Sequence, residues 1–439
     1  MPTLEIPGNI VPREVEVHLR EKVAIMCGME RWRFPGSQPV SFRKRDVERL
    51  HREDYWVCEK SDGIRVIMLI LPVMDGQEVY LIDRTENFRN ITGLYFPHFR
   101  NKAHPLGDTL LDGELVLDKD PRGGPDILKL YVFDCMVCDG QNIMEKTLSS
   151  RTGRLMQYVE QPFQGMLKEM PHMAASFPFQ VTVKKMRPSY YVSKTVKEDI
   201  PNQPHESDGL IYTNVMNRYA IGTDTSLLKW KAPSENSIDF KLELRFPNMN
   251  GTEEPDFTAK PVFLLLANHG TRGARGLRES KYEYYDLMEM EDEEWEKMKA
   301  SGVQVDDRIV EVSWDPAKSR WLFMRFRDDK TDGNHISVIQ NIIESITDGV
   351  EVDQLLDTAD AVRAAWKTRE SQPPPTPGTS QLPAPPRRDS RMGNVPAPIN
   401  YKDEYCYVHP DMKFPEGHIR SSLVYSRWSG PPSVNGVLR

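Results

Sequence analysis

Six short polar clusters carry the side chains of this sequence that could do chemistry. Each interrupts an apolar, strand-like run or stands at its exit. Buried strands seldom contain charges unless the charges pair or bind something. Ion pairs at strand ends would explain one such cluster, whereas six together indicate a site where paired and perturbed charges concentrate. In chain order they are KSDGIR at 60–65, DGE at 112–114, YVFD at 131–134, SDGLIY at 207–212, LLKWKAP at 227–233 and RFRDDK at 325–330.

The apolar runs around these clusters predict the elements that must position them. From about residue 55 to about residue 240, β-rich runs alternate with polar helical stretches, which indicates a mixed α+β core of antiparallel sheets. The runs YWVC and VIMLIL enclose the first cluster and predict a buried β-hairpin with a functional turn. Before them, SFRKRDVERLHRED at 41–54 predicts a charged surface helix with Ser41 as its N-cap.

The second half of the chain predicts a barrel, two helices and a tail. A strand-rich block from about 238 to 330 has the spacing of a small five-stranded barrel. Helical patterns follow in HISVIQNIIESI and VDQLLDTADAVRAAWKTRE, and the proline-rich stretch after them cannot build a core. The predicted domains are 1–237, 238–331, a C-terminal helical segment at 332–370, and a proline-rich tail at 371–439 that is expected to be disordered.

Length and composition narrow the class of protein. A chain of 439 residues is long enough for two or three domains. The net charge of −8 excludes a broadly basic nucleic-acid coat, so phosphate contacts must come from local groups of Lys and Arg. VIMLILPVM is far shorter than the roughly 20 residues of a membrane span. No secretory signal stands at the N-terminus, and five scattered cysteines argue against a disulfide framework, so we expect an intracellular protein without membrane contact.

The order and spacing of the six clusters resemble the collinear motifs of the covalent nucleotidyltransferase superfamily, which contains mRNA capping guanylyltransferases and the ATP- and NAD-dependent ligases. The motifs cover about 270 residues, and the ordered set is far more specific than a lone KxDG. WLFMRFRDDK at 321–330 is similar to the capping-enzyme form of the last motif. FPGSQPVSF at 34–42 is similar to the entry segment of fungal capping enzymes. The chain thus resembles fungal guanylyltransferase subunits.

This resemblance implies a fold and a reaction. The fold would be α+β, with an ATP-grasp-like nucleotidyltransferase domain of antiparallel sheets and helices followed by an OB-fold β-barrel. GMP would pass from GTP through a lysyl-GMP intermediate to the 5′-diphosphate end of nascent pre-mRNA, with release of pyrophosphate. Lys60 would attack the α-phosphate, and a lysine of ordinary pKa, about 10.4, must first lose a proton. Lys229 and Lys231 would disfavour its charged form and neutralise the phosphate.

The resemblance also assigns contacts with the nucleoside. Arg65 and Glu114 would hold the ribose hydroxyls. Phe133 would stack on the base, although a lone Phe on a strand is more often part of a core. The guanine edge would be read by Lys184 or by its neighbour Lys185, between which the sequence does not decide.

Further charged residues would contact the metal and the phosphates. Asp208 would organise a divalent cation, Mg²⁺ or Mn²⁺, and such a hard ion completes its shell with phosphate oxygens and water. Asp239 stands where capping enzymes place another acid near the β and γ phosphates, and Arg84 would be a further ribose or phosphate contact. The barrel would close over the cleft and reopen to admit RNA. Its cations that would grip the phosphates are Arg325, Arg327 and Lys330.

Two other functions fit parts of this pattern. An ATP-dependent polynucleotide ligase would use the same Lys60 chemistry, and nucleotide preference separates it from a capping enzyme. A non-catalytic binding protein of the same fold would have no need of Lys60 or the lysine pair, yet both are present.

Partners follow from the resemblance and from the length of the first segment. Only 59 residues precede Lys60 and no HCxxGxxR phosphatase loop occurs, so a separate RNA 5′-triphosphatase subunit is expected. The resemblance further implies a 5′-diphosphate RNA substrate, recruitment to the phosphorylated C-terminal domain of RNA polymerase II, and location in the nucleus.

Overall fold

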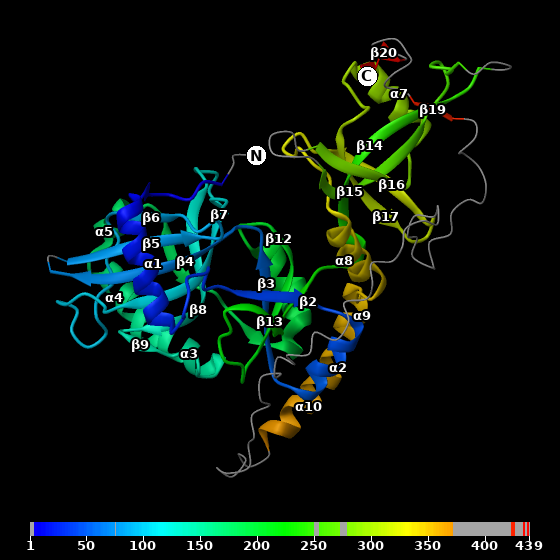
Figure 1. Ribbon diagram of the computed structural model, residues 1–439. Helices are drawn as coiled ribbons and strands as arrows, with labels where there is room; N and C mark the ends of the chain where they lie inside the picture. The colour runs from blue at the N-terminus through cyan, green and yellow to red at the C-terminus, as the bar shows by residue number, and fades with distance from the viewer. Residues whose placement is uncertain are drawn as a thin grey trace. The chain divides into compact units, whose positions relative to one another are not determined.

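The computed structural model describes residues 4–74, 76–249, 254–272 and 279–371, together with three short strands near the C-terminus. It divides into unit 1, residues 1–232 and 350–372, and unit 2, residues 233–349 and 373–439. Both units combine sheets with helices (Figure 1), which confirms the predicted α+β class. Within the described ranges, no helix has the length and apolar character that a membrane span requires.

The large sheet of unit 1 is mainly antiparallel. Its strand order is β1-β6-β5-β4-β7-β8-β10, with β9 paired to the end of β8, and β10 runs parallel to β8. The strands are β1 (Asn9–Ile10), β4 (Ile64–Val73), β5 (Gly76–Asp83), β6 (Phe88–Ile91), β7 (Thr109–Asp118), β8 (Ile127–Cys138), β9 (Gln141–Asn142) and β10 (Gln180–Val183).

Helices cover both faces of the large sheet, which explains why β4 reads as a continuous apolar run. Val66 and Met68 face a core shared with a helical layer, whereas Ile67 and Leu69 face a second core shared with α1 (Arg13–Cys27). Figure 1 shows α1 crossing the sheet. The helical layer consists of α3 (Leu148–Arg154), η1 (Leu155–Glu160), α4 (Gln161–Glu169) and α5 (Pro171–Ser176).

The small sheet of unit 1 has the order β11-β3-β12-β13-β2, and β2 runs parallel to β13. Short turns of helix, η2 (Ser189–Tyr191), α6 (Val192–Lys194), η3 (Thr195–Asp199) and η4 (Ile200–Asn202), precede β12. The strands of the small sheet are β2 (Ser37–Ser41), β3 (Tyr55–Ser61), β11 (Arg187–Pro188), β12 (Ser207–Asn214) and β13 (Gly222–Trp230).

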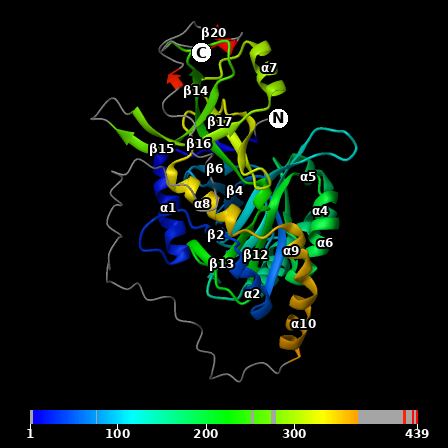
Figure 2. The ribbon, with the colours of Figure 1, turned by 90° about the vertical axis from the view of Figure 1, so that its right-hand side faces the viewer.

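Three helices, from two distant parts of the chain, cover the small sheet. They are α2 (Lys44–Arg52), α9 (Val352–Asp357) and α10 (Ala359–Glu370). Leu50 of α2, Leu355 of α9 and Val362 of α10 are buried in one core with the strands. In both views, α2 and α10 lie side by side (Figure 1, Figure 2). The segment 350–372, which follows residues 233–349 of unit 2, is therefore part of the scaffold of unit 1.

The predicted N-cap of α2 is wrong. Ser41 is the last residue of β2, and the helix begins at Lys44 with Arg43 as its N-cap. The carboxylate of Asp46 accepts a hydrogen bond from the Arg43 backbone N–H at 2.9 Å. Pairing of β2 with β13 keeps Ser41 in a strand, so a sheet contact overrides the local capping signal.

Unit 2 contains the predicted five-stranded barrel. Its strands are β14 (Ser237–Pro247), β15 (Val262–Arg272), β16 (Glu279–Glu289), β17 (Ile309–Asp315) and β18 (Arg320–Phe326). They close into the ring β14-β15-β16-β18-β17, because β14 pairs with both β15 and β17. A 3-10 turn, η5 (Pro233–Glu235), precedes the barrel, and α7 (Asp292–Ser301) lies between β16 and β17.

The predicted helical segment at 332–370 is divided between the two units. Ile339 and Ile343 of α8 (Ile336–Thr347) pack into the barrel core, whereas α9 and α10 pack in unit 1. In the predicted tail, β19 (Leu423–Tyr425) pairs with β14, and β20 (Ser433–Val434) pairs with β21 (Val437–Leu438). The expected disorder of the tail concerns residues 372–422, 426–432, 435–436 and 439, which lie outside the described residues.

Candidate active site

A cavity of about 630 Å³ in unit 1 has walls from both sheets. The large sheet contributes residues of β4, β7 and β8, and the small sheet contributes residues of β2, β3, β12 and β13. Helix α3 and the loops after β5, β10 and β12 contribute further residues to the wall. The structure thereby brings together seven of the residues that the sequence predicted as a site: Lys60, Arg65, Arg84, Glu114, Phe133, Lys184 and Lys229.

The first polar cluster connects the two sheets, and the predicted β-hairpin at this point is wrong. Lys60 is on β3 of the small sheet, whereas Arg65 is on β4 of the large sheet. The strands on each side of the turn therefore diverge instead of pairing. As a result, two residues five positions apart in sequence stand on opposite walls of one cavity.

The DG pairs at 62–63 and 208–209 need glycine because another strand passes close by. A Cβ on Gly63 would lie 2.3 Å from the backbone oxygen of Leu115 on β7. A Cβ on Gly209 would lie 2.0 Å from the oxygen of Trp230 on β13, and the φ of Gly209 is 144°. Such approaches exclude a side chain. Gly63 thus lets the turn after Lys60 approach β7, and Gly209 lets β12, which carries Asp208, lie tightly against β13.

Lys60, Asp208 and Lys229 form a charged group on the small sheet. The Nζ of Lys60 lies 2.5 Å from Oδ1 of Asp208. Burial lowers the pKa of Lys229, and the charges of Lys60 and Arg84 lower it further, although Asp208 opposes them. Lys231 is exposed and is not among the residues that line the cavity. Two lysines and one carboxylate thus stand together where an anionic substrate could enter.

A break in the register of the large sheet exposes Phe133 to the cavity. Asp112 pairs with Asp134, but Gly113 pairs with Val132, so Phe133 is the extra residue of a β-bulge. Consecutive residues normally point to opposite faces of a sheet, and a bulge removes this restriction. Both Phe133 and Asp134 consequently line the cavity. The guanidinium of Arg65 lies 5.4 Å from the centre of the Phe133 ring.

Glu114 lies beside Arg65 on the neighbouring strand, as its cross-strand partner. Burial raises the pKa of Glu114, whereas the nearby cations Lys184, Arg65, Lys60 and Arg84 oppose this shift. Arg84 itself is exposed at the edge of the cavity. The turn that carries it is ordered by Asp83, whose carboxylate accepts hydrogen bonds from the backbone N–H of Thr85 at 2.8 Å and that of Asn87 at 3.1 Å.

The structure distinguishes Lys184 from Lys185. Lys184 is 8% exposed and lines the cavity, whereas Lys185 is exposed and does not. The Nζ of Lys184 donates to Ser61 Oγ at 2.7 Å and lies 2.9 Å from Glu59 Oε1. His205 supports the same group, with its Nε2 3.2 Å from Ser61 Oγ and its Nδ1 2.8 Å from Asp118 Oδ1.

These contacts shift the pKa values of Glu59 and His205, which lie close to Lys184. Burial would raise the pKa of Glu59, but the hydrogen bond with His205 and the charge of Lys184 outweigh it, so the pKa is lowered. Burial would lower the pKa of His205, but its hydrogen bonds with Asp118 and Glu59 outweigh burial and raise the pKa. Sequence reasoning missed Glu59, Ser61 and His205, although the first polar cluster contains Ser61 and adjoins Glu59.

The four predicted site residues of the barrel belong to unit 2, where they interact with one another and with neighbouring acids. Arg327 Nη1 lies 3.1 Å from both carboxylate oxygens of Asp239, and Lys330 pairs with the same carboxylate. Arg325 Nε donates to Glu311 at 2.7 Å. The last predicted motif is thus a local charge cluster in unit 2.

Four further residues complete the unit 1 cavity, and sequence reasoning gave none of them a role: Asp112, Asp134, Arg151 and Tyr219. Asp112 is paired with Arg65, and Asp134 is paired with Arg151 at 2.7 Å. Tyr219 also lines the cavity. The two acids belong to polar clusters seen in the sequence, but Arg151 and Tyr219 stand in ordinary polar stretches that carry no signal.

The residues present fit a metal ion that arrives with a nucleotide. In the part of the chain that the structure describes, no group of three His, Cys, Asp or Glu side chains is arranged to hold an ion. Asp208 offers one carboxylate beside Lys60. Mg²⁺ is commonly bound through one or two carboxylates, with phosphate oxygens and water as its other ligands.

Comparison with known proteins gives a consistent result over most of the chain. The family model of the mRNA capping enzyme catalytic domain matches residues 1–233, and that of the mRNA capping enzyme C-terminal domain matches residues 235–356. The mRNA-capping enzyme subunit alpha of Neurospora crassa is 39% identical over 381 residues, which are 83% of this chain and 93% of that protein. The protein of the same name from Schizosaccharomyces pombe is 38% identical over 84% of this chain and 90% of its own length.

Proposed function

The chain belongs to the mRNA capping enzyme family, and we propose that its unit 1 transfers GMP from GTP to RNA with Lys60 as the nucleophile. One observation carries this assignment of roles. Lys60 and Lys229 line one cavity together with Lys184 and Phe133, and Asp208 is paired with Lys60. A cavity with amines beside a carboxylate, and with an aromatic face and a buried donor, has the parts that a nucleoside triphosphate requires.

The reaction begins when Lys60 loses its ammonium proton, and the Asp208 carboxylate at 2.5 Å is placed to accept it. The neutral amine then attacks the α-phosphorus of GTP. A nitrogen–phosphorus bond forms, the bond to the bridging oxygen breaks, and pyrophosphate leaves with that electron pair. Loss of a second proton gives the lysyl-GMP phosphoramidate.

In the second half-reaction, a terminal oxygen of the RNA 5′-diphosphate attacks the same phosphorus. The nitrogen–phosphorus bond breaks, and Lys60 takes up a proton again. The product is RNA with a GpppN cap. Lys229 stands beside Lys60 and would stabilise the negative charge that develops on the α-phosphate in both steps.

Preference for guanine follows from the chemistry of Lys184. A lysine ammonium donates hydrogen bonds and cannot accept them. Guanine offers the O6 acceptor, whereas adenine presents an amino donor at the corresponding position. Lys184 is held by Glu59 and Ser61, so its position is fixed before a nucleotide binds. A base with a carbonyl oxygen is therefore favoured over adenine.

The remaining contacts are part of the same proposal. Phe133 would stack on the base, and Arg65 and Glu114 would hold the ribose. Asp208 would contribute one ligand to Mg²⁺ or Mn²⁺, an ion that supplies charge stabilisation at the phosphates. The phosphates would also be contacted by Arg84 and Lys231. Movement of unit 2 during the cycle would bring the barrel residues close to the phosphates: Asp239, Arg325, Arg327 and Lys330.

The relatives are named subunit alpha, which implies a partner subunit for them. We propose that the partner of this chain is an RNA 5′-triphosphatase, because the substrate needs a diphosphate end. Recruitment to the phosphorylated C-terminal domain of RNA polymerase II, in the nucleus, would bring the enzyme to nascent RNA.

The test is covalent labelling. The protein is incubated with Mg²⁺ and either GTP or ATP, each labelled at the α-phosphate, and is then run on a denaturing gel. We expect GTP to label the protein and ATP to label it weakly or not at all. Preferential labelling by ATP would support a polynucleotide ligase, and absence of label with both nucleotides would refute the proposal.

A further inference from the structure

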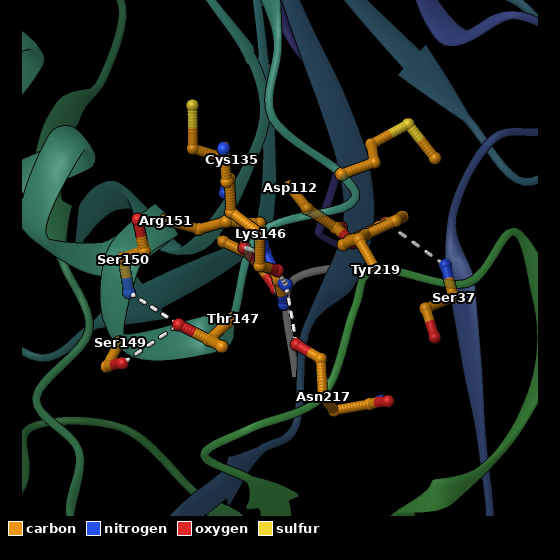
Figure 3. Close-up of polar contacts among 12 residues, drawn as sticks. Ser37, Asp112, Cys135, Lys146, Thr147, Ser149, Ser150, Arg151, Asn217 and Tyr219 are labelled. Carbon is orange, nitrogen blue, oxygen red and sulfur yellow. Dashed lines mark hydrogen bonds and ion pairs between the residues drawn. The ribbon is translucent and has the colours of Figure 1, made fainter. Parts of the chain in front are cut away.

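Tyr219 lines the cavity from the small-sheet side and contacts the large sheet. It stands in the connection between β12 and β13, and its side chain is 6% exposed. Its hydroxyl donates to Asp112 on β7 and accepts a hydrogen bond from the backbone N–H of Ser37 at 3.1 Å. Figure 3 shows Tyr219 between these two residues.

Asp112 in turn holds Arg65. The Nε of Arg65 donates to Asp112 Oδ1 at 2.9 Å, and its Nη2 donates to Oδ2 at 2.5 Å. Arg65 Nη1 donates to the backbone oxygen of Ser37. Ser37, Arg65, Asp112 and Tyr219 therefore form a closed circuit of hydrogen bonds, which we call the Asp112 ring.

Charge and burial determine which groups of the Asp112 ring donate hydrogen bonds and which accept them. Asp112 is fully buried, and Arg65 is 7% exposed. Burial and the Asp112 charge raise the pKa of Tyr219 well above its ordinary value, so its hydroxyl keeps its proton and donates it to Asp112. Buried hydrogen bonds to a charged group are stronger than those between neutral groups, and they fix geometry as well.

The loop that carries Tyr219 is held independently of the hydroxyl. Arg151 Nη1 donates to the backbone oxygens of Asn217 at 2.8 Å and Lys146 at 2.6 Å (Figure 3), and the Tyr219 backbone N–H donates to Met144 at 2.8 Å. The Arg151 guanidinium also lies 5.7 Å from the centre of the Tyr219 ring. Removal of the hydroxyl alone should therefore leave the loop and the ring in place.

We propose that Tyr219 is a positioning residue, which through Asp112 and Ser37 fixes the guanidinium of Arg65 for the ribose of the bound nucleotide. The proposal rests on the proposed function. An arginine side chain has five N–H groups. The Asp112 ring uses three of those on Arg65, at Nε, Nη1 and Nη2, and the remaining two are the ones we assign to the ribose. Contact with the Phe133 face sets the tilt of the same guanidinium.

The test compares Tyr219→Phe with the wild-type protein on GTP, 2′-deoxy-GTP and 3′-deoxy-GTP. The measured quantity is kcat/KM for formation of the covalent GMP adduct. The wild-type protein should prefer GTP over at least one deoxy analogue. In Tyr219→Phe, we expect kcat/KM for GTP to fall about 10-fold, since a buried hydrogen bond to a charged group is lost. For the analogue that lacks the contacted hydroxyl, kcat/KM should fall much less. The ratio of kcat/KM for GTP to kcat/KM for this analogue should therefore decrease.

Tyr212→Phe is the matched control. Tyr212 is on β12 of the same sheet, is fully buried, and among the described residues its hydroxyl has no hydrogen-bond partner. This variant should keep the wild-type preference. The number of active sites, counted as moles of GMP bound per mole of protein, corrects each variant for any unfolded fraction.

The outcomes separate the two proposals. If the wild-type protein forms no GMP adduct, the proposed function fails and this inference fails with it. Two other outcomes would refute the positioning role of Tyr219 and leave the proposed function standing. In the first, the wild-type protein forms the adduct but does not prefer GTP over either deoxy analogue. In the second, Tyr219→Phe lowers kcat/KM for all three nucleotides by the same factor.

Discussion

The side-chain amine of Lys60 and the carboxylate of Asp208 lie 2.5 Å apart although 148 positions separate them in sequence. Their strands, β3 and β12, are neighbours in the small sheet. A carboxylate this close can accept the proton that the lysine must lose and can stabilise the ammonium form between turnovers. The pair therefore predicts how substitutions at the proposed nucleophile will behave.

Lys60→Arg should fold and still bind GTP but form no covalent adduct. Arginine keeps the positive charge opposite Asp208, yet it cannot lose a proton at usable pH and so cannot attack phosphorus. Labelling with GTP on a denaturing gel tests this, and Lys119→Arg at an exposed position is the control. The wild-type adduct should be labile to acid and stable to alkali, as a phosphoramidate is. A labelled Lys60→Arg protein would contradict the assignment of the nucleophile.

Lys184→Gln should reduce the preference for GTP over ATP, whereas Lys185→Gln should not. A glutamine amide can accept as well as donate, so it no longer discriminates against the amino group of adenine. Lys185 is exposed and outside the cavity wall, which makes it a control of the same type at the adjacent position. The ratio of labelling rates with GTP and ATP should fall about 10-fold or more in Lys184→Gln. An unchanged ratio would remove Lys184 from base recognition.

Lys330→Ala should impair the two half-reactions unequally. Loss of one contact to the leaving pyrophosphate typically costs about 100-fold in rate. Transfer of GMP from an already formed adduct to diphosphate-ended RNA releases no pyrophosphate and should suffer less. Arg327 remains to pair with Asp239 in this variant, so the fold of unit 2 is expected to persist. Lys318→Ala, at an exposed barrel position, is the control. Equal impairment of both steps would contradict the role of Lys330.

His205 should give unit 1 a stability that declines as pH rises. Burial opposes its charge, but Asp118 and Glu59 outweigh burial, so the folded-state pKa lies above the ordinary value of 6.5. A raised pKa contributes stability that is complete below about pH 6.5 and is lost as pH rises through the folded-state pKa. The difference in melting temperature between wild type and His205→Asn should thus be largest at acidic pH and shrink above neutrality. The exposed His104→Asn variant should show no such trend.

Removal of the chain after α10 should leave adduct formation intact, whereas removal of α9 and α10 as well should abolish it. A protein that ends at residue 372 keeps all of unit 1 and should form the adduct as the full chain does. A protein that ends at residue 349 loses Leu355 and Val362 from the core of the small sheet. Each large buried side chain contributes about 2–5 kcal/mol, so this protein should unfold or lose its label. Full activity without α9 and α10 would show that these helices are dispensable.

Local sequence patterns predicted most of the strands and helices and their order. Apolar runs bounded by turn residues located the strands around the six polar clusters, and the spacing of 238–330 predicted the barrel that closes through β14. These features depend on periodicity and turn chemistry, which act over a few residues. The resemblance to covalent nucleotidyltransferases also followed from local motifs in a fixed order.

Which residues meet could be seen only in the folded chain. It placed Lys60 and Arg65 on different sheets, where the local pattern predicted one hairpin. It buried Lys184 and exposed Lys185, although the two have the same side chain. It joined Tyr219 to Asp112 across 107 positions, and it returned α10 to unit 1 after the barrel. Each of these results depends on contacts between segments far apart in the chain, and neither local propensity nor hydrophobic period specifies such partners.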